Sequence, residues 1–204
     1  GHFWMGQSLL KEGRLPYWTQ LLDFPAGGTL WVKDPITLVL MLPVQLLAGV
    51  PAAFTFGEML AVLLAGIGFY LLARFFGISR LVAVLASLTF AFSPHALGEA
   101  FNANTEALGG GWCALWVWAM LRMIRKGSVG SVITAGLLLL CLLASNQYFG
   151  LTMAIASVPI LVVALRSRMS LRPAPRQLGT VALGVGLGLL LFLPLAIGLM
   201  RSMG

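Results

Sequence analysis

The chain has 204 residues, of which 59% are hydrophobic and only 9% are charged. A soluble domain carries about a quarter charged residues. This composition therefore excludes a folded water-soluble core and predicts an integral membrane protein. The net charge of +7 does not indicate nucleic-acid binding, because the cytoplasmic loops of membrane proteins retain Lys and Arg.

The first 35 residues form the only long polar stretch. Prolines and glycines interrupt regular structure at Pro16, Pro25, Gly27 and Gly28. The stretch also contains three tryptophans, Trp4, Trp18 and Trp31. Tryptophan favours the membrane–water boundary, so we predict that residues 1–35 form a loop on the membrane surface. Met5 to Leu10 could form a short amphipathic helix within it.

An apolar segment follows from Ile36 to Val50. At about fifteen residues it is short for a span, and it contains Pro43 and Gln45, so we predict an interfacial or re-entrant helix over 36–50. Longer apolar runs then predict an all-α, polytopic transmembrane helix bundle that forms one domain over 53–200. The predicted spans are 53–73, 80–97, 106–121, 129–145, 150–165 and 178–199. Because the chain opens at Gly1 without a Met, we expect it to be a piece of a longer protein.

Basic residues orient the predicted bundle. The connections near 74–80, 122–127 and 166–176 hold nine Lys or Arg and no acid. Positive loops resist translocation, so we expect these connections in the cytoplasm and residues 1–52, 93–105 and 146–149 outside. All six acids would then lie on the outer side: Glu12, Asp23, Asp34, Glu58, Glu99 and Glu106. A full span over 36–50 would instead place residues 1–35 inside.

Glycines and cysteines within the apolar runs are expected to serve packing. Gly184 and Gly188 are four residues apart, which lets a neighbouring helix approach closely. The triplet Gly109-Gly110-Gly111 is interpreted as a packing or flexibility feature rather than a nucleotide loop. The two cysteines, Cys113 and Cys141, are interpreted as small packing residues rather than a disulfide or metal ligands.

The first candidate site is Lys33-Asp34-Pro35, at the start of the short apolar segment. Asp34 could cap that helix, because free N–H groups at a helix N-terminus stabilise a carboxylate. It could equally be a rigidly held carboxylate that binds a metal or a sugar hydroxyl. Lys33, with Lys11 and Arg14, could pair with phosphate oxygens or with lipid head groups.

The second candidate site is the predicted outer loop that ends at Glu106. Its polar residues include His95, Glu99, Asn102, Asn104 and Glu106. Glu106 could cap the next helix, but an ionisable residue near membrane depth is costly, which favours a functional role. His95 is expected at a helix boundary, and it lacks the HxxxH or HExxH spacing of a metal site.

Several short motifs follow one another in a familiar order. They are Gly13-Arg14-Leu15-Pro16-Tyr17-Trp18, Phe24-Pro25-Ala26-Gly27, Asp34-Pro35, a span ending at Tyr70 to Gly77, Ala91-Phe92-Ser93-Pro94 and Asn104-Thr105-Glu106. This layout, over about residues 1–126, resembles the N-terminal half of GT-C superfamily membrane glycosyltransferases. That superfamily includes the protein mannosyltransferase and aminoarabinose transferase relatives. The main acid of the family follows a first span, which would precede Gly1 in this chain.

The resemblance implies an enzyme of the bacterial inner (plasma) membrane. It would transfer a sugar from a polyprenyl-phosphate donor to an acceptor on the extracytoplasmic face. Asp34 and Glu106 match catalytic carboxylates by placement. The candidate substrate-binding residues are Arg14, Lys33, His95, Asn102 and Asn104. A carboxylate could orient or deprotonate the acceptor hydroxyl, and basic groups or a divalent cation, Mg²⁺ or Mn²⁺, would stabilise the departing phosphate.

Two other classes of function stay open. A lipid or solute transporter, or a flippase, is the first, although ion-coupled carriers usually keep charges in mid-span and we expect none here. A non-catalytic membrane subunit is the second, and the glycine-rich last span would suit helix assembly in it.

Overall fold

The computed structural model describes residues 18–19, 28–29, 35–101, 108–166 and 174–203. Within these ranges the chain forms seven α-helices and one ladder of two-residue strands, so the predicted helical class is confirmed. Strand β1 (Trp18–Thr19) pairs antiparallel with β2 (Gly28–Thr29). The remainder of the predicted surface loop, including Met5 to Leu10, lies outside the described residues.

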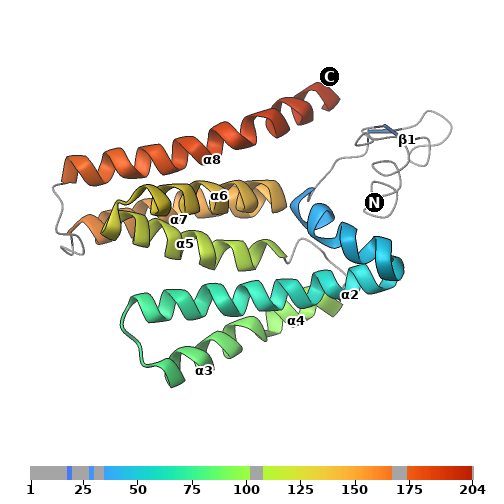
Figure 1. The fold of residues 1–204 in the computed structure, drawn as a ribbon, viewed down its shortest axis with the longest axis horizontal. Helices are drawn as coiled ribbons and strands as arrows, with labels where there is room; N and C mark the ends of the chain where they lie inside the picture. The colour runs from blue at the N-terminus through green and yellow to red at the C-terminus, as the bar shows by residue number, and fades with distance from the viewer. Residues whose placement is uncertain (1–17, 20–27, 30–34, 102–107, 167–173, 204) are drawn as a thin grey trace.

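Helix α2 (Pro35–Phe75) contains both the predicted 36–50 helix and the first predicted span. Gly49 separates the two parts, because its φ of 82° and ψ of 177° lie in a region that essentially only glycine adopts. Pro51 follows, and a proline lacks the N–H that would continue the helical ladder. Figure 1 shows the two parts of α2 running in different directions. The kink lies close to the predicted boundary between residues 36–50 and 53–73, and the interfacial or re-entrant placement of the first part stays a prediction.

The prediction of one helix over 80–97 is wrong. Helix α3 (Arg80–Ala91) ends early, and α4 (Pro94–Phe101) begins where a loop was predicted. At about 1.5 Å per residue, α3 is about 18 Å long, too short to cross a hydrocarbon core of about 30 Å. Pro94 explains the break, because a proline disfavours helical conformation at the residue before it. The Ser93 hydroxyl then accepts a hydrogen bond from the Ala96 N–H (3.4 Å) in the first turn of α4.

The remaining helices follow the predicted spans more closely. They are α5 (Leu108–Lys126), α6 (Val129–Ser145), α7 (Gln147–Arg166) and α8 (Ala174–Met203). Helix α6 coincides with the predicted span 129–145. The predicted loop 146–149 is wrong, because Asn146 alone joins α6 to α7. Its Oδ1 accepts hydrogen bonds from the N–H groups of Tyr148 (2.9 Å) and Phe149 (3.3 Å), as an N-cap does.

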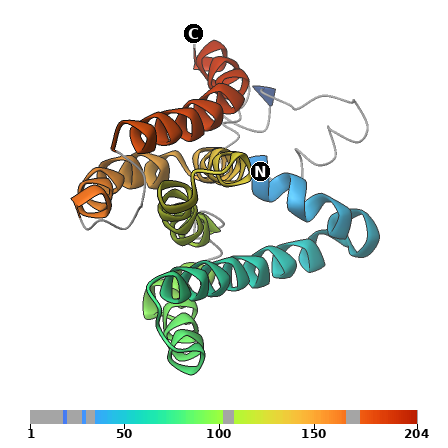
Figure 2. The same cartoon turned by 60° about the vertical axis from the view of Figure 1, so that its left-hand side comes forward.

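Helix α5 lies at the centre of the fold. It contacts α2, α6, α7 and α8, and Figures 1 and 2 show it between α2 and α8. Its buried residues form most of the hydrophobic core, including Trp112, Met120, Met123 and Ile124. Trp116 adds a polar link, because its Nε1 donates to the Ser157 Oγ of α7 at 3.0 Å.

Close helix crossings occur at glycines. A Cβ added to Gly111 of α5 would lie 2.8 Å from the Leu64 Cβ of α2. A Cβ added to Gly188 of α8 would lie 2.9 Å from the Gly136 carbonyl oxygen of α6. Both distances are shorter than real Cβ contacts. The predicted packing roles of Gly111 and Gly188 are therefore confirmed.

The described basic side chains gather at one end of the bundle. Figure 1 shows the α2–α3 connection, the α5–α6 connection and the neighbouring ends of α7 and α8 at that end. The basic residues there are Arg74, Arg80, Arg122, Arg125 and Lys126. The charge clusters that were predicted to share one side of a membrane thus share one end of the fold.

Two helices in the described part of the chain are long and apolar enough to cross a membrane. They are α2 and residues Gln177–Gly198 of α8. Three shorter apolar helical segments accompany them, Arg80–Ala91, Val129–Ser145 and Tyr148–Val163.

Candidate functional site

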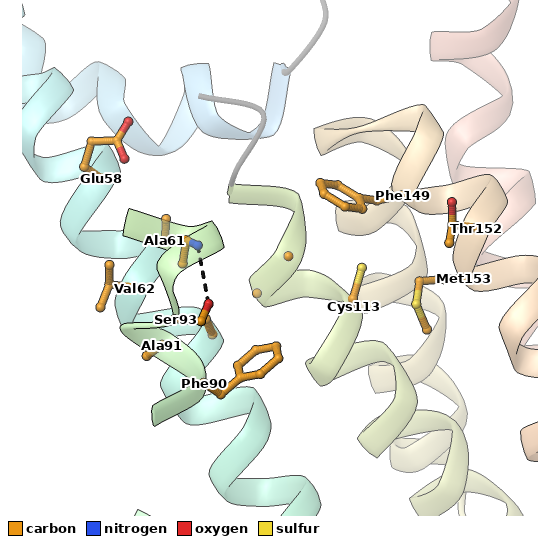
Figure 3. A pocket seen from close by; sticks show the side chains of 14 residues that line it. Glu58, Ala61, Val62, Phe90, Ala91, Ser93, Cys113, Phe149, Thr152 and Met153 are labelled. Atoms are coloured by element: carbon orange, nitrogen blue, oxygen red, sulfur yellow. Dashed lines mark hydrogen bonds between the residues drawn. The ribbon is translucent and has the colours of Figure 1, made fainter. Parts of the chain in front are cut away.

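A cavity of about 320 Å³ opens between α2, α3, α4, α5 and α7. This volume is near the lower end of small-molecule sites, about 300–1,000 Å³. Most of its wall is apolar. Figure 3 shows Glu58 and Val62 of α2 on one side and Phe149, Thr152 and Met153 of α7 on the opposite side.

Helical spacing explains how α2 forms its part of the wall. Glu58, Ala61, Val62 and Ala65 line the cavity, and positions i, i+3, i+4 and i+7 share one face of a helix. The same face is small enough for α5 to approach, since Ala61 and Ala65 are buried. From α5, Gly110 completes the wall, and a Cβ there would meet nothing within 4 Å. The cavity therefore exists because small residues face each other across α2 and α5.

Glu58 is the one charged residue in the described wall of this cavity. Its Oε1 is buried and has no hydrogen-bond partner among the described residues. A buried polar group without a partner costs free energy, so this oxygen is a ready acceptor for a ligand that carries a donor. The other polar groups of the wall are uncharged and are weaker hydrogen-bond acceptors than a carboxylate. They are the Ser93 and Thr152 hydroxyls and the Cys113 thiol.

Glu58 is not among the candidate site residues that the sequence predicts. It was counted among the outer acids, and no charge was expected in mid-span. It lies within α2, inside the predicted span 53–73, and Glu58 and Arg74 are the only charged residues of that helix. The available signal was a single acid inside a long apolar run, which usually marks function in a membrane helix.

Most of the predicted site residues lie outside the described part of the chain. These are Arg14, Lys33, Asp34, Asn102, Asn104 and Glu106. His95 lies in the first turn of α4, and its side chain is not described. The segment 102–107 joins α4 to α5, and both helices line the cavity, through Ala96 and Gly110. Within the described ranges, no three His, Cys, Asp or Glu side chains come together as a metal site would require.

No protein-family model, no curated protein and no solved structure matches the chain. The GT-C resemblance therefore stays a hypothesis that depends on the short motifs alone.

Proposed function

We propose that this chain is an integral protein of a bacterial inner membrane. Only 22% of the apolar window of α2 and 11% of that of α8 is buried within the fold. The core helix of a soluble protein would be mostly buried. Leu183 and Leu190 of α8 are 69% and 65% exposed, and lipid would cover such apolar surface.

Threonine hydroxyls on α2, α3 and α6 also have hydrogen-bond partners within their own helices, which suits a lipid environment. Thr55, Thr89 and Thr134 each donate a hydrogen bond to the carbonyl four residues earlier, at 3.1, 3.0 and 2.7 Å. Because lipid offers no hydrogen-bond partner, polar groups in a membrane must be satisfied internally. We place the basic end of the bundle in the cytoplasm and residues 1–52 outside.

Within this bundle, the function that we favour is glycosyl transfer. The enzyme would move a sugar from a polyprenyl-phosphate donor to an acceptor on the extracytoplasmic face. The Glu58 cavity supports this proposal, because its wall includes Ala96 of α4 and Gly110 of α5, and these two helices precede and follow Asn102, Asn104 and Glu106 in the sequence. Lipid-exposed helix faces would hold the isoprenoid chain, and the cavity would receive the acceptor.

The catalytic groups in this proposal are carboxylates. Asp34 and Glu106 would orient or deprotonate the acceptor hydroxyl as it attacks the anomeric carbon. Arg14 and Lys33, or a divalent cation held by the carboxylates, would stabilise the departing lipid phosphate.

Substitution of these carboxylates tests the transfer reaction. Membrane vesicles with the intact protein would receive polyprenyl phosphate bearing a labelled sugar, and label leaving the lipid would be measured. Asp34→Asn and Glu106→Gln should each slow transfer by about 10²–10⁴-fold, the range of general acid–base catalysis. Glu12→Gln, which removes another predicted outer acid, serves as the control. Normal transfer by both variants would remove the catalytic assignment.

A carrier is the second candidate, and the buried Glu58 oxygen within α2 favours it. Carriers place ionisable side chains at membrane depth on the path of a substrate or ion. Counterflow of labelled substrate in proteoliposomes, with no covalent product and with loss in Glu58→Gln, would support this function over transfer.

A further inference from the structure

The chemistry of the Glu58 cavity limits what it can hold. Apart from Glu58, its described wall consists of aliphatic, aromatic, hydroxyl and thiol side chains, and it includes no Lys, Arg or His. The basic side chains that the structure describes lie at the opposite end of the bundle, at the connections after α2 and α5. Among the described side chains, an anionic group in this cavity would therefore meet a carboxylate and no positive partner.

A positively charged hydrogen-bond donor would instead find a favourable partner in the Glu58 carboxylate. Glu58 Oε1 is buried and unpartnered within the described part of the chain, and a hydrogen bond between charged groups is about twice as strong as a neutral one. Phe90 and Phe149 add aromatic rings to the wall, and these rings offer large apolar surfaces to an alkyl chain. The Phe90 ring is held in place by stacking on Phe69, with centroids 4.7 Å apart.

We infer that the cavity is a binding site for a lipophilic primary amine. The ammonium group would donate to Glu58 Oε1, and the alkyl part would extend past Val62 and Phe90 toward Phe149 and Met153, the direction seen in Figure 3. The volume of about 320 Å³ suits a single medium-length chain rather than a whole polyprenyl lipid. This is the cavity to which the proposed function assigns the acceptor, but the inference concerns binding alone and holds whether or not a sugar is moved.

Photolabelling of the whole chain in nanodiscs tests the inference without any turnover. The probes are diazirine derivatives of decylamine, decanol and decanoate, which share a chain and differ in the head group. Nanodiscs of phosphatidylcholine, which carries no net charge, avoid enrichment of the amine at an anionic bilayer. Labelled peptides are then mapped. We expect the amine to label Phe149 and Met153 about tenfold more than decanoate does.

Two variants separate the head-group contact from the space in the cavity. Glu58→Gln keeps the shape and should abolish the preference for the amine, while decanol labels as before. Gly110→Leu projects into open space and should reduce labelling by all three probes. Gly186→Leu, where a Cβ also meets nothing within 4 Å, is the matched control and should label like the native chain. Equal labelling by amine and decanoate in the native chain, or a preference that survives in Glu58→Gln, would overturn the inference.

Discussion

Replacement of Gly188 by alanine tests the crossing of α6 and α8. The new Cβ would lie 2.9 Å from the Gly136 carbonyl oxygen and 2.9 Å from the Leu139 Cβ. Neither atom is at the end of a flexible side chain, so the two helices would have to separate. Overpacking of this kind costs about 1–3 kcal/mol, and the better helix propensity of alanine offsets about 0.8–1.0 kcal/mol. We expect a net loss of up to about 2 kcal/mol.

Gly186 provides the matched control, since it lies in the same helix only two residues away. A Cβ at Gly186 would meet nothing within 4 Å, so Gly186→Ala gains helix propensity without a clash. The propensity terms of the two variants cancel. The difference in their free energies of unfolding therefore isolates the overpacking cost at Gly188, about 1–3 kcal/mol.

Both variants can be compared by titrating the purified chain from mild detergent into SDS. Tryptophan fluorescence should report unfolding, because Trp112 and Trp116 belong to the buried core beside this crossing. The midpoint for Gly188→Ala should fall below that of the native chain, and the midpoint for Gly186→Ala should equal or exceed it. Equal midpoints for the two variants would refute the close crossing of α6 and α8.

Substitutions at four further positions test three other features of the fold in the same titration. Asn146→Ala should destabilise the chain by about 1 kcal/mol by removing the cap of α7, and Asn146→Ser should restore most of the loss; equal effects would argue against capping. Trp116→Phe and Ser157→Ala should each cost about 0.5–1.5 kcal/mol, with little added loss in the double variant because both remove one hydrogen bond. Gly49→Ala should cost about 1–3 kcal/mol through backbone strain, and a neutral effect would contradict the kink.

Local signals explain which elements could be predicted from the sequence. The limits of α6 were predictable because Ser128 caps its start, where its Oγ accepts from the Ser131 N–H at 3.3 Å, and Asn146 ends its apolar run. Asn146 also explains the wrong prediction of a loop after α6, since an Asn that follows an apolar run is typical of both a loop and an N-cap. The helix break before Pro94 was not predicted, because the apolar run continues through this position and hydropathy alone does not mark a break.

The candidate site was less predictable, because it depends on contacts between distant parts of the chain. Glu58 could have been singled out as a lone acid in an apolar run. The cavity beside it could not, since it requires Gly110 of α5 and Phe149 of α7 to face the same stripe of α2. No spacing within one helix specifies how three helices meet. The predicted residues Asp34 and Glu106 stay predictions.

The bend at Gly49 makes the first part of α2 a lever. The residues from Pro35 to Ala48 form a rod about 20 Å long, at about 1.5 Å per residue. A rotation of about 10° at the bend would swing Pro35 through about 4 Å, estimated from that length. The φ and ψ angles of Gly49 therefore set the position of Pro35 relative to the second part of α2. A small change in these two angles would produce a large displacement at the far end of the first part.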